Sequence, residues 1–176
     1  MISKKQKHFL KLYQPVHARF EKFCRARAFG DMPYEDLVND SLLIAFKKLD
    51  EIKNEKAFLS FLIGISTRIL ANSKRKKKAI NVEEPAIFNQ HPDPNNFIEK
   101  QFEIELLYQS LAKLPELQKE AIILFEITGF SIKEIMKVQN SGESAVKQRL
   151  ARGRKELAKI IKHQVEFKLI ENETGR

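Results

Sequence analysis

The sequence predicts an all-α protein made of two small helical domains joined by a flexible linker. Only six glycines and six prolines occur in 176 residues, which leaves long stretches without a helix breaker. Apolar residues recur at steps of three and four, with little of the two-residue alternation typical of strands. Residues 79–97 lack this period and contain three prolines and four asparagines. We therefore expect domains at residues 1–78 and 98–162, a linker between them and a tail at residues 163–176.

Three helices are expected in the first domain. An apolar stripe over residues 9–23 predicts one helix that ends near Gly30. Pro33 opens a second helix, which has acids in its first turn and an apolar body over residues 37–49. Asn54 is a suitable cap for the third. That helix places five apolar residues on one face before the basic stretch SKRKKK, namely Phe58, Phe61, Leu62, Ile65 and Ile69.

The second domain is predicted to contain four helices separated by helix breakers. The breaks fall at Pro115, Gly129 and Gly142. The expected helices span residues 98–112, 115–128, 131–139 and 142–162. The last fourteen residues give no strong signal.

The composition favours a polyanionic partner and argues against several other classes. Thirty-two Lys and Arg against 23 Asp and Glu give a net charge of +9. No apolar run is long enough to cross a membrane and the N-terminus has no signal-peptide pattern, so we expect a cytoplasmic protein without membrane insertion. Cys24, the only cysteine, is interpreted as a buried apolar side chain, and the four histidines lack metal-ligand spacing. We expect no metal and no cofactor.

A helix-turn-helix is predicted near the end of the second domain. Ser131 followed by Glu134 is the pattern of a capping box, in which each side chain bonds the other residue's backbone amide. After a turn at residues 139–141, the next helix places on its inner stripe Val146, Leu150, Gly153 and Leu157. Its opposite side carries a polar, basic face formed by Ser144, Lys147, Gln148, Ala151, Arg152 and Lys155.

This polar, basic face suits the major groove of DNA. Arg, Lys and Gln side chains can bond base edges, and an alanine methyl can meet the methyl group of thymine. The alternative is an ordinary amphipathic helix with a solvated cationic face. The capped preceding helix, the turn length and the positive net charge favour DNA recognition.

Two stretches of the sequence resemble conserved modules of one family. The fourth region of bacterial sigma factors of the extracytoplasmic-function group is similar to LAKLPELQKEAIILFEITGFSIKEIMKVQNSGESAVKQRLARGRKEL. Their second region is similar to YEDLVNDSLLIAFKKLD and AFLSFLIGISTRILANSKRKKK. With the linker, the two modules cover residues 8–162 in the family's order. The resemblance implies a non-catalytic, dissociable subunit of RNA polymerase that reads the −10 and −35 promoter elements and helps open the duplex.

The resemblance also assigns residues to two of these contacts. The family's −35 base contacts fall on Lys147, Gln148, Ala151 and Arg152, within the face described above. Its contacts with the clamp helices of the largest polymerase subunit fall on Asp36, Asn39 and Asp40. These three would act as acceptors for basic side chains across the interface. Alternatively, Asp36 only complements the helix dipole.

The third expected helix should face the −10 element. Opposite its apolar stripe, small residues give way to bases in the order Ser60, Gly64, Thr67, Ala71, Lys74, Arg75 and Lys78. Such a surface permits close backbone approach and neutralises phosphates, although a frayed basic helix end is the alternative. The resemblance places a pocket for a flipped base near the preceding loop. The −10 candidates are Asn54, Lys56, Arg68, Asn72, Lys74, Arg75 and Lys78.

The sequence departs from the family pattern at several positions. Phe61 stands where many relatives have Trp, and we expect it to pack in the core together with Phe58. Arg68 and Asn72 replace a frequent Asn and Asp. Further departures are Gln139, at an apolar position of the helix-turn-helix, and Gly142, where Ser or Pro often begins the recognition helix. A modestly stable second domain is expected.

The expected function is that of an alternative sigma factor whose partners are core RNA polymerase and promoter DNA. Many members of the resembled family are held inactive by an anti-sigma protein, which is a further possible partner. A stand-alone helix-turn-helix regulator that binds an operator as a dimer is the alternative, but it leaves the DLVND segment without a role. A DNA-processing enzyme is a third class, and no cluster of catalytic side chains supports it.

Overall fold

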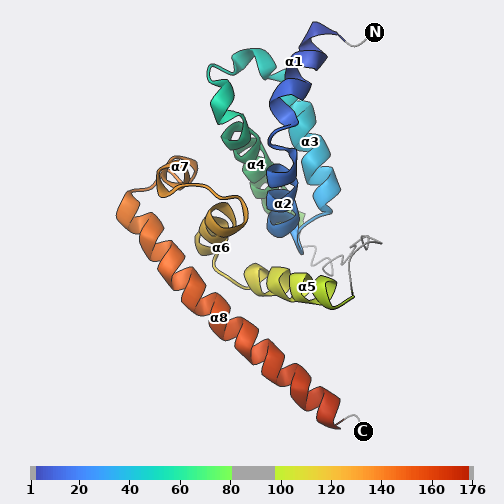
Figure 1. Ribbon diagram of the computed structural model, residues 1–176, viewed down its shortest axis with the longest axis vertical. Coiled ribbons are helices and arrows are strands. Elements are labelled where there is room, and N and C mark those ends of the chain that lie inside the picture. The colour runs from blue at the N-terminus through green and yellow to red at the C-terminus, as the bar shows by residue number, and fades with distance from the viewer. Residues whose placement is uncertain (1–2, 81–97, 175–176) are drawn as a thin grey trace. The chain divides into compact units, whose positions relative to one another are not determined.

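The computed structural model describes residues 3–80 and 98–174 (Figure 1). Eight α-helices and no strand occur within these residues, which confirms the predicted all-α class. The helices fall into two compact units, which are described separately below. The predicted linker lies outside the described residues, except for its first two residues, which close a helix.

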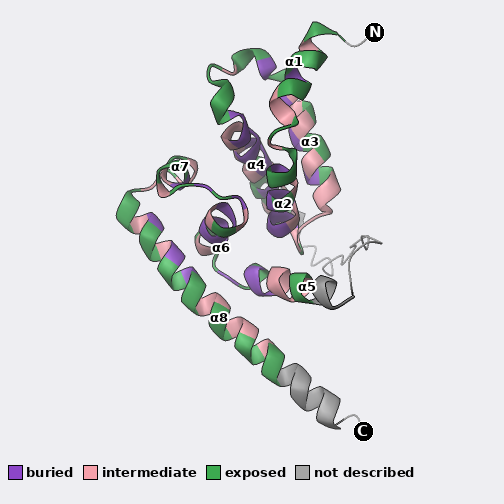
Figure 2. Ribbon diagram, viewed as in Figure 1, coloured by how far each residue is buried: buried purple, intermediate pink, exposed green. Residues whose placement is uncertain are grey.

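The first unit is built around one central helix. Its α-helices are α1 (Lys4–Tyr13), α2 (His17–Ala28), α3 (Tyr34–Lys47) and α4 (Phe58–Ile80). Two 3₁₀ turns, η1 (Leu49–Glu51) and η2 (Glu55–Ala57), connect α3 to α4. Because α4 contacts the other three helices, the core of the unit forms around it. Figure 2 shows buried residues along α2 and α4, and the largest are Phe20, Phe23, Phe58, Leu62, Ile63 and Leu70.

The prediction of a single helix over the first apolar stripe was wrong. The stripe is divided around Pro15, because α1 ends at Tyr13 and α2 begins at His17. Proline has no backbone N–H and its ring clashes with the carbonyl four residues earlier, so an α-helix cannot continue through it without distortion. A short turn replaces the helix there, with the Val16 amide donating to the Tyr13 carbonyl at 3.0 Å. Apolar spacing alone concealed this break.

The predicted helix boundaries at Gly30 and Pro33 are confirmed, whereas Asn54 caps a 3₁₀ turn and not the third helix itself. Gly30, with a φ of +77°, lies in the turn that follows α2, and Pro33 is the N-cap residue of α3. The Asn54 side chain accepts a hydrogen bond from the Lys56 amide and so caps η2, which leads directly into α4. Cys24 is fully buried, and burial raises the pKa of its thiol well above the usual range. It is a core residue, as the sequence predicted.

The burial of α4 is wider than the predicted single face. Besides the expected apolar stripe, four residues on other sides of the helix are buried, namely Leu59, Ile63, Ser66 and Leu70. The reason is that α4 is packed by helices on several sides, so its first half has no fully solvated face. Its exposed residues are confined largely to the second half.

The second unit begins with α5 (Ile98–Ala112), which is followed by α6 (Glu116–Ile122). A single π-helical segment, η3 (Ile123–Ile127), extends α6 before Gly129. The last two helices are α7 (Ile132–Val138) and α8 (Glu143–Thr174). Helices α5, α6 and α7 all contact α8. Helix α8 continues beyond the predicted end at residue 162, through most of the last fourteen residues, for which no element was predicted.

Candidate nucleic-acid interface

The helix-turn-helix begins at the predicted capping box. The Ser131 hydroxyl accepts from the Glu134 amide at 3.3 Å, and the Ser131 amide donates to the Glu134 carboxylate at 2.8 Å. These two bonds pair amides that a helix start leaves without intrahelical partners. The start of α7 is therefore fixed by local chemistry.

The turn between α7 and α8 is a Schellman motif. Asn140 has a φ of +44°, in the left-handed region that asparagine tolerates better than most residues. The Ser141 amide then donates to the Met136 carbonyl at 3.0 Å, which satisfies a carbonyl at the end of α7. A tight turn of this type sets the direction in which α8 leaves.

The two predicted sides of α8 have opposite exposure. On the inner side Val146 and Leu150 are buried, and Leu157 is half-buried. Gly153 is buried as well, and α6 lies close to it. A Cβ added at this position would lie only 3.0 Å from the Cγ1 atom of Ile122 in α6. All six residues of the predicted outer face are exposed, namely Ser144, Lys147, Gln148, Ala151, Arg152 and Lys155. We call these six residues the outer face of α8.

An acidic residue at the start of the outer face was missed by sequence reasoning. The Glu143 carboxylate accepts a hydrogen bond from Lys147, with the ion pair at 2.6 Å. This hydrogen bond, together with the Lys147 charge, lowers the pKa of the Glu143 carboxyl. The i, i+4 spacing and the preference for acids at helix starts were the available signals. Lys147 therefore has a competing partner when it meets a phosphate or a base.

The basic half of α4 is divided between exposed side chains and side chains that hold the fold. Arg68, Asn72, Arg75 and Lys78 are exposed, and Arg75 donates to the Asn72 side-chain oxygen. Lys74 is half-buried and pairs with the Asp31 carboxylate at 3.1 Å. Lys77 donates to the Asp31 carbonyl at 2.8 Å, so both lysines tie α4 to the turn before α3. Lys74 thus has a structural contact that the sequence did not predict.

The remaining −10 candidates lie at the η2 turn. Asn54 and Lys56 are both exposed there. The loop is connected to α1 by an ion pair between Lys5 and Asp50 at 2.6 Å and by a hydrogen bond between His8 and Glu55 at 2.8 Å. Phe58, at the base of the loop, is buried against Phe9 with ring centroids 5.6 Å apart. The predicted core role of Phe58 is confirmed, whereas Phe61 is only half-buried.

Helix α3 presents an exposed polar face opposite its buried residues. Asp36, Asn39 and Asp40 are all exposed, and Leu43, one turn further along, is 54% exposed. The opposite side of α3 is buried at Leu37, Ser41 and Ala45. The three polar residues therefore lie together on one surface, as their spacing requires.

The described residues show no sign of a membrane segment or a metal centre. No helix within residues 3–80 or 98–174 is long and apolar enough to span a bilayer. No group of three or more His, Cys, Asp or Glu side chains with metal-binding geometry occurs in this part of the chain.

Comparison with known proteins identifies the family. A family model described as sigma-70, region 4, matches residues 104–157, which include the helix-turn-helix. The RNA polymerase sigma factor NccH of Alcaligenes xylosoxydans xylosoxydans is 26% identical over 145 residues, covering 77% of this chain and 78% of the relative. The ECF RNA polymerase sigma-E factor of Escherichia coli K12 is 25% identical over 137 residues, 71% of each chain. This chain belongs to the extracytoplasmic-function sigma factors.

Two solved structures share the fold of this sigma factor. RpoE of Bartonella quintana, determined in complex with the anti-sigma factor NepR, matches with a TM-score of 0.72 at 24% identity. That match covers 91% of this chain and 98% of RpoE. CnrH, determined in complex with the cytosolic domain of CnrY, matches with a TM-score of 0.65 at 22% identity and 90% coverage of both chains.

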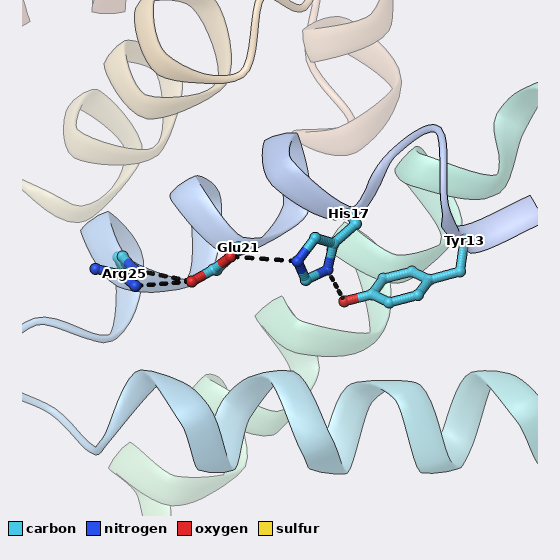
Figure 3. A network of polar contacts seen from close by, with 4 residues as sticks. All are labelled: Tyr13, His17, Glu21 and Arg25. Atoms are coloured by element: carbon cyan, nitrogen blue, oxygen red, sulfur yellow. Dashed lines mark hydrogen bonds and ion pairs between the residues drawn. The ribbon is translucent and has the colours of Figure 1, made fainter. Parts of the chain in front are cut away.

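The sigma factor also has a polar chain along α2 that sequence reasoning missed (Figure 3). The Tyr13 hydroxyl and His17 Nδ1 are 2.7 Å apart, and His17 Nε2 lies 3.5 Å from the Glu21 carboxylate. Glu21 in turn accepts from Arg25 at 2.8 Å, and the Arg25 guanidinium lies over the Tyr34 ring at 4.4 Å. The polar chain links the last residue of α1 to the first residue of α3. It therefore supports the helix that carries the exposed acidic face.

Proposed function

We propose that this sigma factor binds core RNA polymerase through α3 and reads promoter DNA with α8 and α4. The outer face of α8 would contact the −35 element, and the exposed residues of α4 and η2 would contact the −10 element. The observation that carries this proposal is the outer face of α8. Six residues selected for base and phosphate chemistry are all exposed, on the side of the helix opposite its buried stripe.

The proposed polymerase contact uses the exposed face of α3. Asp36, Asn39 and Asp40 present two carboxylates and an amide, which are suitable acceptors for Lys and Arg side chains of the clamp helices. Complementary charge of this kind raises association rates and excludes wrong partners. In this proposal the sigma factor is a non-catalytic cytoplasmic regulator. Core polymerase would hold its two units at the spacing of the promoter elements. Joining two weak DNA contacts in this way gives one strong one.

The −10 contact is proposed for the residues of α4 that remain exposed. Arg68, Asn72, Arg75 and Lys78 are accessible to DNA, and Asn54 and Lys56 are accessible at η2. Lys74 is proposed to act there only indirectly, because its ammonium group pairs with Asp31. An anti-sigma protein is a further proposed partner. The complex of the similar sigma factor RpoE with the anti-sigma factor NepR supports this part of the proposal.

One experiment tests the polymerase contact. Purified sigma factor is mixed with core polymerase and a promoter library, and specific initiation is measured. We expect initiation to fail when Asp36 and Asp40 are both changed to Lys. A charge-matched control changes the exposed Glu103 and Glu166 to Lys and should still initiate. The proposal would be refuted in favour of a dimeric regulator if the protein bound specific DNA tightly on its own and if adding polymerase did not change that binding.

A second experiment tests the −35 contact. Changing Arg152 to Ala should weaken discrimination of one −35 position by about 1–3 kcal/mol, which is roughly ten- to hundred-fold. Changing Lys155 to Ala should weaken all sequences equally and reduce the salt dependence by about one phosphate contact. Lys159→Ala, at an exposed position further along α8, is the control and should change neither quantity. Equal effects of all three substitutions would contradict the assignment.

A further inference from the structure

The side chain of Gln139 lies at the centre of a hydrogen-bond network between three elements. Its Nε2 group donates to the Leu117 carbonyl and to the Glu120 carboxylate of α6, both at 3.0 Å. Its Oε1 atom accepts from Arg149 of α8 at 2.8 Å. The same Arg149 nitrogen donates to the Ser141 hydroxyl at 2.8 Å. We call Leu117, Glu120, Gln139, Ser141 and Arg149 the turn network.

Glutamine is the residue type that this arrangement requires. The site presents two acceptors on one side and a cationic donor on the other, and a neutral amide offers two N–H donors and one carbonyl acceptor. An apolar residue would leave the Glu120 carboxylate, which is 5% exposed, without the Gln139 donor. Removing one partner from a buried polar group costs its desolvation free energy. Gln139, which departs from the family's apolar pattern, therefore belongs to a matched set of polar groups.

Arg149 is directed away from the outer face of α8. It is half-buried, and its guanidinium bonds to Gln139 and to the turn instead of standing beside the exposed Gln148 and Arg152. Its charge is therefore used within the second unit. The bonds reach α8 near the middle of the segment that carries the outer face, and they connect that segment to α6.

We propose that Gln139 and Arg149 are positioning residues for −35 recognition, a role that rests on the proposed function of α8. Packing of Val146, Leu150 and Gly153 holds α8 onto the unit, and the turn network fixes the angle of its first turns. Base-edge hydrogen bonds depend steeply on distance and angle, so a small rotation of α8 weakens several of them together. Phosphate attraction is much less directional and changes little.

The test uses full-length sigma factor with core polymerase. Initiation is measured from a promoter with the preferred −35 element and from one in which that element is scrambled, over a range of salt concentrations. Gln139→Leu should lower the ratio of the two rates by about ten-fold, which corresponds to about 1.4 kcal/mol. The salt dependence should stay unchanged, because no phosphate contact is lost. Gln14→Leu, at an exposed glutamine of the first unit, is the control and should keep the full ratio.

Arg149→Gln separates positioning from direct DNA contact. A positioning role predicts the same loss of ratio as Gln139→Leu and an unchanged salt slope, whereas a phosphate contact would lower the slope by about one. A lowered slope, or an unchanged ratio in Gln139→Leu, overturns the proposal. A wild-type protein that ignores the −35 element would instead refute the proposed function itself.

Hydrogen exchange will show whether the second unit of Gln139→Leu is still folded. If it is unfolded, two compensating substitutions test the proposal instead. Gln139→Glu alone places two carboxylates against each other, and Glu120→Gln added to it restores a donor between them. The double variant should recover most of the ratio that Gln139→Glu loses. Failure of this folded double variant to recover it overturns the proposal.

Discussion

The buried glycine of α8 gives a prediction whose sign is opposite to that expected from helix propensity. A Cβ at Gly153 would lie 3.0 Å from Ile122 Cγ1 and 3.4 Å from the Gln118 Cβ. Alanine normally stabilises a helix interior by about 1 kcal/mol relative to glycine. Overpacking a well-packed interface costs about 1–3 kcal/mol. Ile122 cannot move aside easily, because a β-branched side chain in a helix has one strongly preferred χ1 rotamer.

We therefore expect Gly153→Ala to lower the free energy of unfolding of the second unit by about 1 kcal/mol. The control is Gly64→Ala in α4, where the added Cβ meets no atom within 4 Å. That variant should raise the free energy of unfolding of the first unit by about 1 kcal/mol. The same substitution thus has opposite signs in two helices of one chain.

Hydrogen exchange on the full-length protein measures both effects, because the amides of each unit report its own opening free energy. Peptides from α6 and α8 should exchange faster in Gly153→Ala, and peptides from α3 and α4 should exchange more slowly in Gly64→Ala. If Gly153→Ala stabilises the second unit as much as Gly64→Ala stabilises the first, then close approach of α6 to α8 does not restrict residue 153.

Three further substitutions test other features of the fold. Asn140→Gly should stabilise the second unit by up to about 1 kcal/mol in urea denaturation, because glycine adopts a positive φ without strain; a loss of stability would contradict the left-handed turn. Ser131→Ala should destabilise the second unit by about 1 kcal/mol through loss of the capping box. A variant as stable as the wild type would contradict this role of Ser131. Burial raises the pKa of the Cys24 thiol in the folded protein. The stability that the buried neutral thiol contributes should therefore be lost as pH rises above about 8.5, where the thiol of the unfolded chain ionises. Cys24→Ala should show a weaker loss of stability over that range, and identical pH profiles would exclude this linkage.

Features set by local spacing could be predicted from the sequence. The capping box of Ser131 and Glu134 requires only two residues three positions apart, and the buried stripe of α8 follows from helical periodicity. The exposure of the outer face follows from the same periodicity. Pro15 was the local exception, because the apolar spacing continues on both sides of the break.

Features set by partners distant in the sequence could not be predicted in this way. Lys74 was assigned to DNA because it lies in a basic run, but its partner Asp31 comes from another part of the chain. Gln139 was noted only as a departure, since its partners in α6 and α8 are identified by the packing of three elements. The roles of the −10, −35 and polymerase-binding residues stay predictions.

The continuity of α8 makes its two ends mechanically dependent on each other. Its 32 residues form a helix about 48 Å long, and the outer face occupies only the first part. A rigid rod acts as a lever, so tilting α8 by roughly 10° at the turn would move a point 20 residues away by about 5 Å. A spectroscopic label near His163 would therefore magnify small changes in the angle at which the helix meets DNA.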